Sequence, residues 1–228
     1  LLINRYSDGD IVQGVIKACA RFQGSFALVV MTADKLIAVR DPFGIRPLVL
    51  GKSLDDTVVA SETCAIDSIG GTVERDVKPG EVVVIDAEGE HSYFLPKEKK
   101  TASCIFEYVY FARPDSIIDG CSVYESRKEA GRILAKYCPV EADIVSGVPD
   151  SAVVAARGYS EVSGIPYVEA LAKNRYVGRT FIQPDQNMRE NSVSVKMNAL
   201  RSNIRGKRLI IVDDSIVRGT TSRKIVRM

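Results

Sequence analysis

Hydrophobic and polar residues follow two different periods along the 228 residues of this chain. Between about residues 25 and 95, β-branched runs ("SFALVVMT", "KLIAVRD", "PLVLGK", "TVVASE", "GEVVVIDA") are separated by turn-forming stretches such as "TAD", "DPFG", "SLDD" and "KPG". Such runs predict antiparallel strands joined by hairpin turns. A helix is predicted before them over residues 9–21, and "FEYVYFA" at 106–112 predicts one further strand.

The second half of the chain alternates between helical and strand periods. Residues 122–138 predict an amphipathic helix, with an inner stripe formed by Val123, Ala130, Ile133, Leu134 and Tyr137. A strand and loop in "ADIVSGVPDS", a helix in "AVVAARGYSEVSG", strands in "IPYVEAL" and "RLIIVDD", and a helix start at 220–228 follow. Strands that alternate with helices favour a parallel sheet. The pattern therefore predicts an antiparallel β-rich unit at about 1–105 and an α/β unit at about 115–228.

Composition excludes several classes of function. Lys and Arg number 31 and Asp and Glu 29, so a net charge of +2 gives no basis for bulk binding to nucleic acid. No apolar run approaches the roughly 20 residues of a membrane helix. The single histidine, His91, falls in a predicted surface hairpin and is interpreted as a solvated residue rather than a catalytic base. The cysteines are odd in number, widely spaced and without a C-x-x-C pair, which favours a reduced, cytoplasmic protein: Cys19, Cys64, Cys104, Cys121 and Cys138.

The stretch "RLIIVDDSIVRGTTSRK" at 208–224 carries the clearest chemistry. Ligands of open parallel sheets bind beyond the carboxyl ends of the strands, where Asp213 and Asp214 stand. A Gly/Thr/Ser loop that opens a helix can hold a phosphate through its backbone N–H groups. Ribose hydroxyls and Mg²⁺ would offset the repulsion between the two carboxylates. Neither the Walker nor the dinucleotide fingerprint is present, and the plainer alternative is a strand end followed by a helix N-cap at Thr220 or Thr221.

"LIIVDDSIVRGTTS" resembles the phosphoribosyl pyrophosphate motif of type I phosphoribosyltransferases, in the form found in the glutamine phosphoribosylpyrophosphate amidotransferase family. Five further stretches resemble the same family: "DPFGIRPL" at 41–48, "VVASETCA" at 58–65, "YFARPDS" at 110–116, "GVPDS" at 147–151 and "KNRYVGRTFIQP" at 173–184. The resemblance implies the back half of a class II, N-terminal-nucleophile glutaminase domain (α+β) at 1–105. It implies an α/β type I phosphoribosyltransferase domain at 106–228, truncated after the start of the phosphate-loop helix, so the chain is expected to be an interior segment of a longer enzyme.

The resemblance implies a glutamine-dependent pentosyltransferase that makes 5-phosphoribosylamine, glutamate and pyrophosphate from phosphoribosyl pyrophosphate, glutamine and water. This is the first step of de novo purine biosynthesis, and the family suggests purine nucleotides as inhibitors, a homodimer or homotetramer, and a cytoplasmic location. The family's nucleophile is an N-terminal cysteine, whereas this chain begins with Leu1. We therefore expect no catalytic nucleophile on this chain and no activity on glutamine, and we interpret Arg46 and Glu62 as structural residues.

The same resemblance assigns the site residues. Ser151, Asp213 and Asp214 would form the Mg²⁺ site, the turn at 147–151 would meet the pyrophosphate, and the polar segment 173–206 would close over the substrate. Cys104 would be one ligand of a [4Fe–4S] cluster in the complete protein, with no stable cluster expected in this chain, and Cys64 is interpreted as a core residue. The implied substrate-binding residues are Asp213, Asp214, Ser215, Arg218, Gly219, Thr220, Thr221, Ser222, Lys173, Tyr176 and Arg179.

Two alternatives remain open on the sequence. One is a regulator that binds phosphoribosyl pyrophosphate without chemistry, and the other is a phosphoribosyltransferase that acts on a nucleobase. The glutaminase-like motifs in the first half argue against both. Pyrophosphate release that depends on ammonia, release that depends on a base, or binding without release would separate the three hypotheses.

Overall fold

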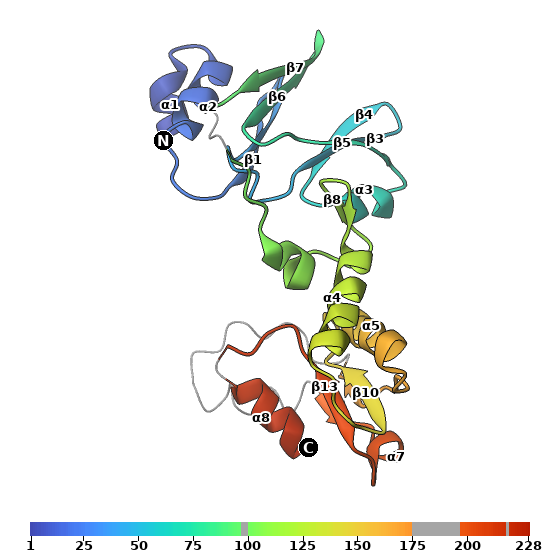
Figure 1. Ribbon diagram of the computed structural model, residues 1–228. Coiled ribbons are helices and arrows are strands. Elements are labelled where there is room, and N and C mark those ends of the chain that lie inside the picture. The colour runs from blue at the N-terminus through green and yellow to red at the C-terminus, as the bar shows by residue number, and fades with distance from the viewer. Residues whose placement is uncertain (97–99, 175–196, 218) are drawn as a thin grey trace. The chain divides into compact units, whose positions relative to one another are not determined.

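The structure is a computed structural model that describes residues 1–96, 100–174, 197–217 and 219–228 (Figure 1). The chain forms two compact units, Leu1–Val123 and Tyr124–Met228. Within these ranges no helix has the length and apolar character needed to cross a membrane.

The first unit consists of two antiparallel sheets with short helices. The larger sheet has the order β1-β2-β6-β7 and the smaller one β4-β3-β5. All neighbouring strands in these sheets pair antiparallel, as the hairpin pattern predicts. α2 confirms the predicted first helix, whereas α1, α3 and β5 were not predicted. The bounds are α1 Leu2–Ser7, α2 Ile11–Cys19, β1 Ala27–Met31, β2 Leu36–Arg40, β3 Val49–Ser53, β4 Asp56–Ala60, α3 Thr63–Ser68, β5 Thr72–Asp76, β6 Glu81–Asp86 and β7 Gly89–Phe94.

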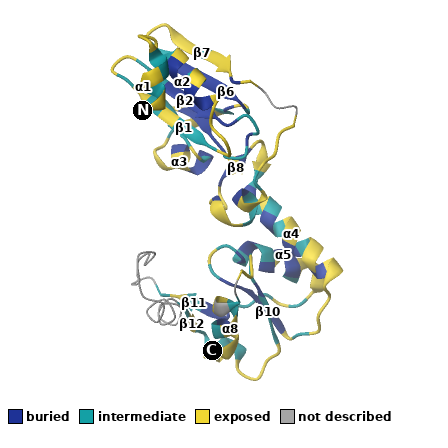
Figure 2. Ribbon diagram, turned by 90° about the vertical axis from the view of Figure 1, so that its left-hand side faces the viewer, coloured by how far each residue is buried: buried dark blue, intermediate teal, exposed yellow. Residues whose placement is uncertain are grey.

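The larger sheet is buried on both faces at its centre, where β2 and β6 lie (Figure 2). Side chains alternate along a strand, so Ile37 packs in the cluster that contains Val15 of α2, while Ala38 packs with Leu50 of the smaller sheet. Cys64 is 4 % exposed, which confirms the prediction of a core residue. His91 lies on β7 in the β6–β7 hairpin with 43 % of its side chain exposed, as predicted.

The predicted strand at 106–112 is wrong, because Glu107–Phe111 forms a π-helix, η1. A short, mostly apolar run of seven residues has too few positions for its period to distinguish helix from strand. The buried Glu107 side chain within it forms an ion pair with Arg46 (2.5 Å). A hairpin of β8 (Ile117–Ile118) and β9 (Cys121–Ser122) follows. Its two-residue turn, Asp119-Gly120, has φ values of 48° and 77°, the left-handed values of a type I′ turn.

The second unit contains a parallel strand pair. β10 (Ile144–Gly147) and β13 (Leu209–Val212) pair in register from Ile144↔Leu209 to Gly147↔Val212, which confirms the predicted parallel pairing. The predicted strand at 165–171 is largely wrong: only Tyr167 bridges to Val145, and the following β11 pairs antiparallel with β12. The other bounds are α4 Val123–Tyr137, α5 Val153–Ser163, β11 Leu171–Lys173, β12 Met197–Ala199, α7 Arg201–Ile204 and α8 Thr220–Arg227.

The predicted inner stripe of α4 is also wrong in most of its members, although the helix itself is confirmed. Ile133, Leu134 and Tyr137 are 46 %, 40 % and 81 % exposed, and Ala130 is exposed as well. The buried positions recur every fourth residue instead, at Val123, Arg127, Gly131 and Ala135.

Glycine explains this shift of the buried face. A Cβ atom added to Gly131 would lie 1.8 Å from the Ala155 carbonyl oxygen, and one added to Gly158 would lie 2.0 Å from that of Lys128. The backbones of α4 and α5 therefore approach each other through two residues that have no side chain. A search for large apolar residues cannot detect such a face.

Candidate functional site

The site is built where β10 and β13 end side by side. The Val148 N–H donates to the Val212 carbonyl (2.9 Å), so the ladder continues one residue beyond the paired ends Gly147 and Val212. The two following loops therefore leave the same edge of the sheet, as expected for a ligand site of a parallel sheet. Gly147 is required here, because a Cβ atom would lie 2.5 Å from the Ala152 carbonyl oxygen. The peptide bond between Pro149 and Asp150 is cis.

The three residues predicted for Mg²⁺ come together at this edge. The Ser151 hydroxyl donates to Asp214 Oδ2, and the Ser215 hydroxyl donates to Asp214 Oδ1 (2.9 Å). The Asp214 backbone N–H donates to Asp213 Oδ1 (3.0 Å). Burial raises the pKa of Asp213, the neighbouring Asp214 charge raises it further, and the backbone hydrogen bond only partly offsets these effects.

Within the described ranges, neither Asp213 nor Asp214 forms an ion pair. Lys173, which was predicted to contact substrate, pairs with Asp150 in the turn at 147–151. The cation is therefore placed beside the turn that was predicted to meet pyrophosphate. The two adjacent carboxylates accept hydrogen bonds from neutral groups.

This donor set fits Mg²⁺. Three or more His, Cys, Asp or Glu side chains do not gather into a metal site anywhere in the described part of the chain. Mg²⁺ is commonly held by one or two carboxylates, with substrate phosphates and water as the remaining ligands. The oxygen atoms of Asp213, Asp214 and Ser151 are of the required kind, so a larger protein cluster is not needed.

The predicted phosphate loop leads into α8. Gly219, with φ 67°, is the N-cap of this helix, rather than Thr220 or Thr221. Ile225 anchors α8 in the core of the second unit. Thr221 is exposed, Ser222 is half-buried, and Thr220 is the first helical residue. Of the other predicted contacts, Tyr176, Arg179 and Arg218 lie outside the described residues.

Cys104 does not sit in a cysteine cluster. It is a free, half-buried thiol, and its backbone N–H donates to the Ile45 carbonyl (3.4 Å). An iron–sulfur cluster of this kind needs four cysteine ligands, which the described residues do not bring together. The residues present here therefore do not by themselves fit a [4Fe–4S] cluster.

The first unit holds a polar cavity of about 370 Å³. Glu107, which sequence reasoning missed, contributes to it together with its partner Arg46. The only signal in the sequence was a carboxylate within an aromatic run, "FEYVYF". The cavity is lined by Ser25, Phe26, Ala27, Arg46, Pro47, Ser61, Glu62 and Glu107.

Comparison with known proteins gives a match to part of the chain and matches to nearly all of it. Residues 2–68 match the family described as "Glutamine amidotransferase domain". The amidophosphoribosyltransferase of Archaeoglobus fulgidus is 53 % identical over 222 residues, which are 97 % of this chain and 48 % of that protein. The chloroplastic amidophosphoribosyltransferase of Glycine max is 53 % identical over 94 % of this chain and 38 % of its own length.

A solved structure agrees with these relatives. Glutamine phosphoribosylpyrophosphate amidotransferase from B. subtilis, complexed with ADP and GMP, matches with a TM-score of 0.90 and 49 % identity, over 100 % of this chain and 50 % of that one. The chain thus spans about half the length of the relatives that it matches.

The fold therefore matches that of a phosphoribosylpyrophosphate amidotransferase over the whole of this chain, and its first part resembles a glutamine amidotransferase domain. More particularly, the chain is a homologue of the amidophosphoribosyltransferases, with 51–54 % identity over nearly all of its own length. The family resemblance drawn from the six sequence motifs is confirmed.

Proposed function

We propose that this protein is an amidophosphoribosyltransferase, which makes 5-phosphoribosylamine, glutamate and pyrophosphate from phosphoribosyl pyrophosphate, glutamine and water, the first step of purine biosynthesis. The observation that carries the proposal is the meeting of Asp213, Asp214 and Ser151 at the ends of two parallel strands. The names of the relatives support it. The proposed domains are a glutaminase-type domain at 1–105 and a phosphoribosyltransferase domain at 106–228.

The proposed chemistry is a displacement at C1 of the ribose. Ammonia forms a new C1–N bond, the C1–O bond to pyrophosphate breaks, and the departing pyrophosphate takes the bonding electrons. Mg²⁺, when bound by Asp213, Asp214 and Ser151, would stabilise the negative charge on the pyrophosphate. Lys173 lies close enough to the turn at 147–151 to add a second positive charge there.

The side chains at the strand ends would position the sugar phosphate. Asp213 and Asp214 would accept hydrogen bonds from the ribose hydroxyls, with Ser151 and Ser215 fixing the orientation of Asp214. The amides and hydroxyls of the loop would hold the 5′-phosphate, helped by the N-terminus of α8. The residues of that loop proposed to bind, other than Arg218, lie within the described part of the chain: Ser215, Gly219, Thr220, Thr221 and Ser222. Arg218, Tyr176 and Arg179 are proposed further contacts.

Several finer assignments belong to the same proposal. Cys104 would supply one ligand of a [4Fe–4S] cluster whose other ligands come from outside the described residues. Purine nucleotides are proposed as inhibitors, in line with the ADP and GMP in the B. subtilis structure, and the assembly as a cytoplasmic homodimer or homotetramer. We assign no glutamine nucleophile among the residues of this chain.

Pyrophosphate release from the full-length protein tests the proposal. With phosphoribosyl pyrophosphate and Mg²⁺ present, release should require ammonia or glutamine. Release that requires a nucleobase would indicate a nucleobase phosphoribosyltransferase. Binding of phosphoribosyl pyrophosphate without any release would indicate the second candidate, a regulator that binds the substrate without catalysis, which the same two carboxylates also permit.

A further inference from the structure

Residues 102–122, which lead directly into α4, are held on the first unit by polar contacts. At the start of this segment, the Ala102 N–H donates to the Phe43 carbonyl (2.8 Å) and the Cys104 N–H to the Ile45 carbonyl (3.4 Å). Both acceptors belong to the loop between β2 and β3, which carries the motif "DPFGIRPL". This loop is therefore the first of two anchor points for the segment.

The second anchor point is the turn after β4. Glu62 Oε2 accepts hydrogen bonds from the Arg113 N–H and from the Ser116 hydroxyl, each at 2.7 Å. Next to it, Thr63 Oγ1 accepts the Ile117 N–H (2.9 Å). The motif "ASETCA" thus receives the middle of the same segment.

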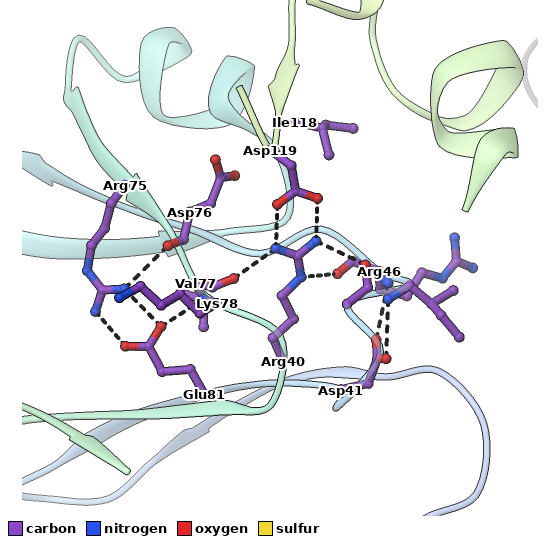
Figure 3. A network of polar contacts seen from close by, with 12 residues as sticks. Arg40, Asp41, Arg46, Arg75, Asp76, Val77, Lys78, Glu81, Ile118 and Asp119 are labelled. Atoms are coloured by element: carbon purple, nitrogen blue, oxygen red, sulfur yellow. Dashed lines mark hydrogen bonds and ion pairs between the residues drawn. The ribbon is translucent and has the colours of Figure 1, made fainter. Parts of the chain in front are cut away.

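The last contact is an ion pair between Arg40 and Asp119 (Figure 3). Two nitrogens of the guanidinium group donate to the two carboxylate oxygens at 2.7 and 2.8 Å. The remaining three donors go to the carbonyls of Arg46 (2.8 Å), Val77 (2.8 Å) and Gly44 (3.0 Å). All five N–H groups of Arg40 are therefore used, and each ties the segment or a neighbouring loop to the end of β2.

The two partners differ in exposure. The Arg40 side chain is 1 % exposed, whereas that of Asp119 is 34 % exposed and projects from the turn of the β8–β9 hairpin. A buried guanidinium needs a carboxylate close to it, because an unpaired buried charge is strongly unfavourable. Docking of the hairpin therefore supplies the charge that Arg40 lacks within its own sheet.

We propose that Arg40 and Asp119 are positioning residues for the glutamine-dependent reaction, because their ion pair fixes the segment that joins the amidotransferase-type unit to the phosphoribosyltransferase unit. This inference rests on the proposed function. The proposed reaction transfers ammonia from glutamine to the sugar phosphate, so glutamine-dependent turnover should depend on how firmly residues 102–122 are held on the first unit. Ammonia supplied in solution reaches the sugar phosphate site without that connection.

Two substitutions in the full-length protein test the proposal. Asp119→Asn keeps the size of the side chain and the Asx preference of the turn but removes the charge. Arg40→Lys keeps the charge but loses the planar, five-donor geometry. Each should lower glutamine-dependent pyrophosphate release by at least about 10-fold, while ammonia-dependent release and glutamine hydrolysis stay within about twofold of the unsubstituted protein.

Arg75→Lys is the matched control. Arg75 also pairs with carboxylates in the first unit, Glu81 (2.9 Å) and Glu90 (2.5 Å), but these lie on β6 and β7 and not on residues 102–122. Its ratio of glutamine-dependent to ammonia-dependent release should be unchanged. A second measurement follows the segment itself: in the Asp119→Asn protein, the amides of Arg113 and Ile117 should exchange hydrogen faster.

Unchanged exchange at these amides, or a parallel fall of both activities, would overturn the inference, since a purely structural role lowers both together. An unchanged ratio in Asp119→Asn and Arg40→Lys would overturn it as well. If the unsubstituted protein released no pyrophosphate with either nitrogen source, the proposed function would fail and this inference with it. A lower ratio of glutamine-dependent to ammonia-dependent release, together with faster exchange at the Arg113 and Ile117 amides, supports the inference.

Discussion

Two sets of charged residues, one in each unit, have opposite environments. In the first unit, Arg40 and Asp119 satisfy each other, and Arg75 is paired with Glu81 and Glu90. In the second unit, Asp213 and Asp214 accept hydrogen bonds from hydroxyl and amide groups, and within the described residues neither has a cationic partner. The charges of the first set neutralise one another, whereas the two carboxylates of the second set can bind a cation that arrives with a ligand.

The units also differ in what supports them. Besides its apolar core, the first unit uses partly buried ion pairs to join elements that are far apart in the chain, such as Arg40 and Asp119. The α4–α5 contact of the second unit relies on close backbone packing at Gly131 and Gly158, with more exposed ion pairs from α4 to Glu161 at its side. A carboxylate at the end of a parallel strand with only neutral partners is therefore a candidate for ligand binding, whereas a carboxylate paired with an arginine supports the fold.

The largest effect should come from removing both open carboxylates. Asp213→Asn with Asp214→Asn should weaken binding of phosphoribosyl pyrophosphate in the presence of Mg²⁺ by at least about 1000-fold, or about 4 kcal/mol, because the amides cannot neutralise the metal. The fold should persist, since the substitution preserves size. Isothermal titration calorimetry measures the affinity, and circular dichroism checks the fold.

Asp143→Asn is the control for this double substitution. Asp143 lies just before the other end of β10 and pairs with Arg208 (3.0 Å), so the same chemical change is made away from the site. Its affinity should equal that of the unsubstituted protein. Equal affinity in the double variant would contradict the proposed site and remove the contrast between the units.

The next largest effect concerns the packing of the second unit. Gly158→Ala would place a methyl group 2.0 Å from the Lys128 carbonyl oxygen, so α4 and α5 must separate. We expect a loss of about 2–3 kcal/mol in the free energy of unfolding, the range of an overpacked core. Thermal unfolding measures this loss.

The exposed position Ala130 on α4 gives the reverse exchange as a control. Ala130→Gly should cost about 1 kcal/mol through helix propensity alone. If Gly158→Ala were as stable as the unsubstituted protein, the close approach of the two helices would be contradicted. Close packing at the two glycines would then not explain how α4 and α5 are held together.

A third prediction tests how the ion-pair network of Arg75, Glu81 and Glu90 in the first unit depends on pH. Burial alone would raise the pKa of Glu81, but hydrogen bonds from Arg75, the Lys78 N–H and the Ser92 hydroxyl outweigh it, so the pKa is lowered from its ordinary 4.5. Such a group contributes stability above the ordinary pKa and loses it as the pH falls through the lowered value. Glu81→Gln should therefore destabilise the protein by about 1.5–3 kcal/mol at neutral pH.

The difference between Glu81→Gln and the unsubstituted protein should shrink as the pH is lowered below 4.5. Urea unfolding at a series of pH values measures it. A difference that does not depend on pH would show that the charge of Glu81 makes no contribution, and Glu88→Gln, at an exposed position in the β6–β7 turn, serves as the control.

The smallest effect should have the opposite sign. Burial raises the pKa of Asp213 above its ordinary 3.8, so its contribution to stability is present below that value and is lost as the pH rises through the raised pKa. Without ligand at neutral pH, Asp213→Asn should therefore stabilise the protein by a few tenths of a kcal/mol to about 1 kcal/mol. Destabilisation in the same urea measurement would indicate that Asp213 has a structural partner, as Glu81 has.

Much of this contrast could be predicted from local sequence. The run "RLIIVDD" indicates a buried strand that ends in carboxylates. The alternation of strands and helices indicates a parallel sheet, in which this strand and β10 end at the same edge. Ser151 was assigned through a resemblance in "GVPDS", and the structure places its hydroxyl on Asp214. These signals lie within short stretches, so they can be interpreted without knowing the fold.

The parts that were missed depend on partners distant in sequence. Arg40 and Asp119 are 79 positions apart, and Arg46 and Glu107 are 61 apart. Nothing in "FEYVYFA" specifies that Glu107 will be buried against an arginine, so the run resembled a strand. The prediction of the buried face of α4 was wrong for a different reason. Gly131 contributes to packing by lacking a side chain, so a search for apolar residues does not find it.

The alignment of β10 with β13 has one more consequence. Ser151 and Asp214 share a hydrogen bond only because Gly147 stands opposite Val212, so the alignment of two strands decides which loop atoms meet. A single residue inserted between Ile144 and Gly147 would shift that alignment and turn successive side chains to opposite faces. The proposed site would then be disrupted although every residue proposed to bind was still present, so the length of β10 is itself a determinant of ligand binding.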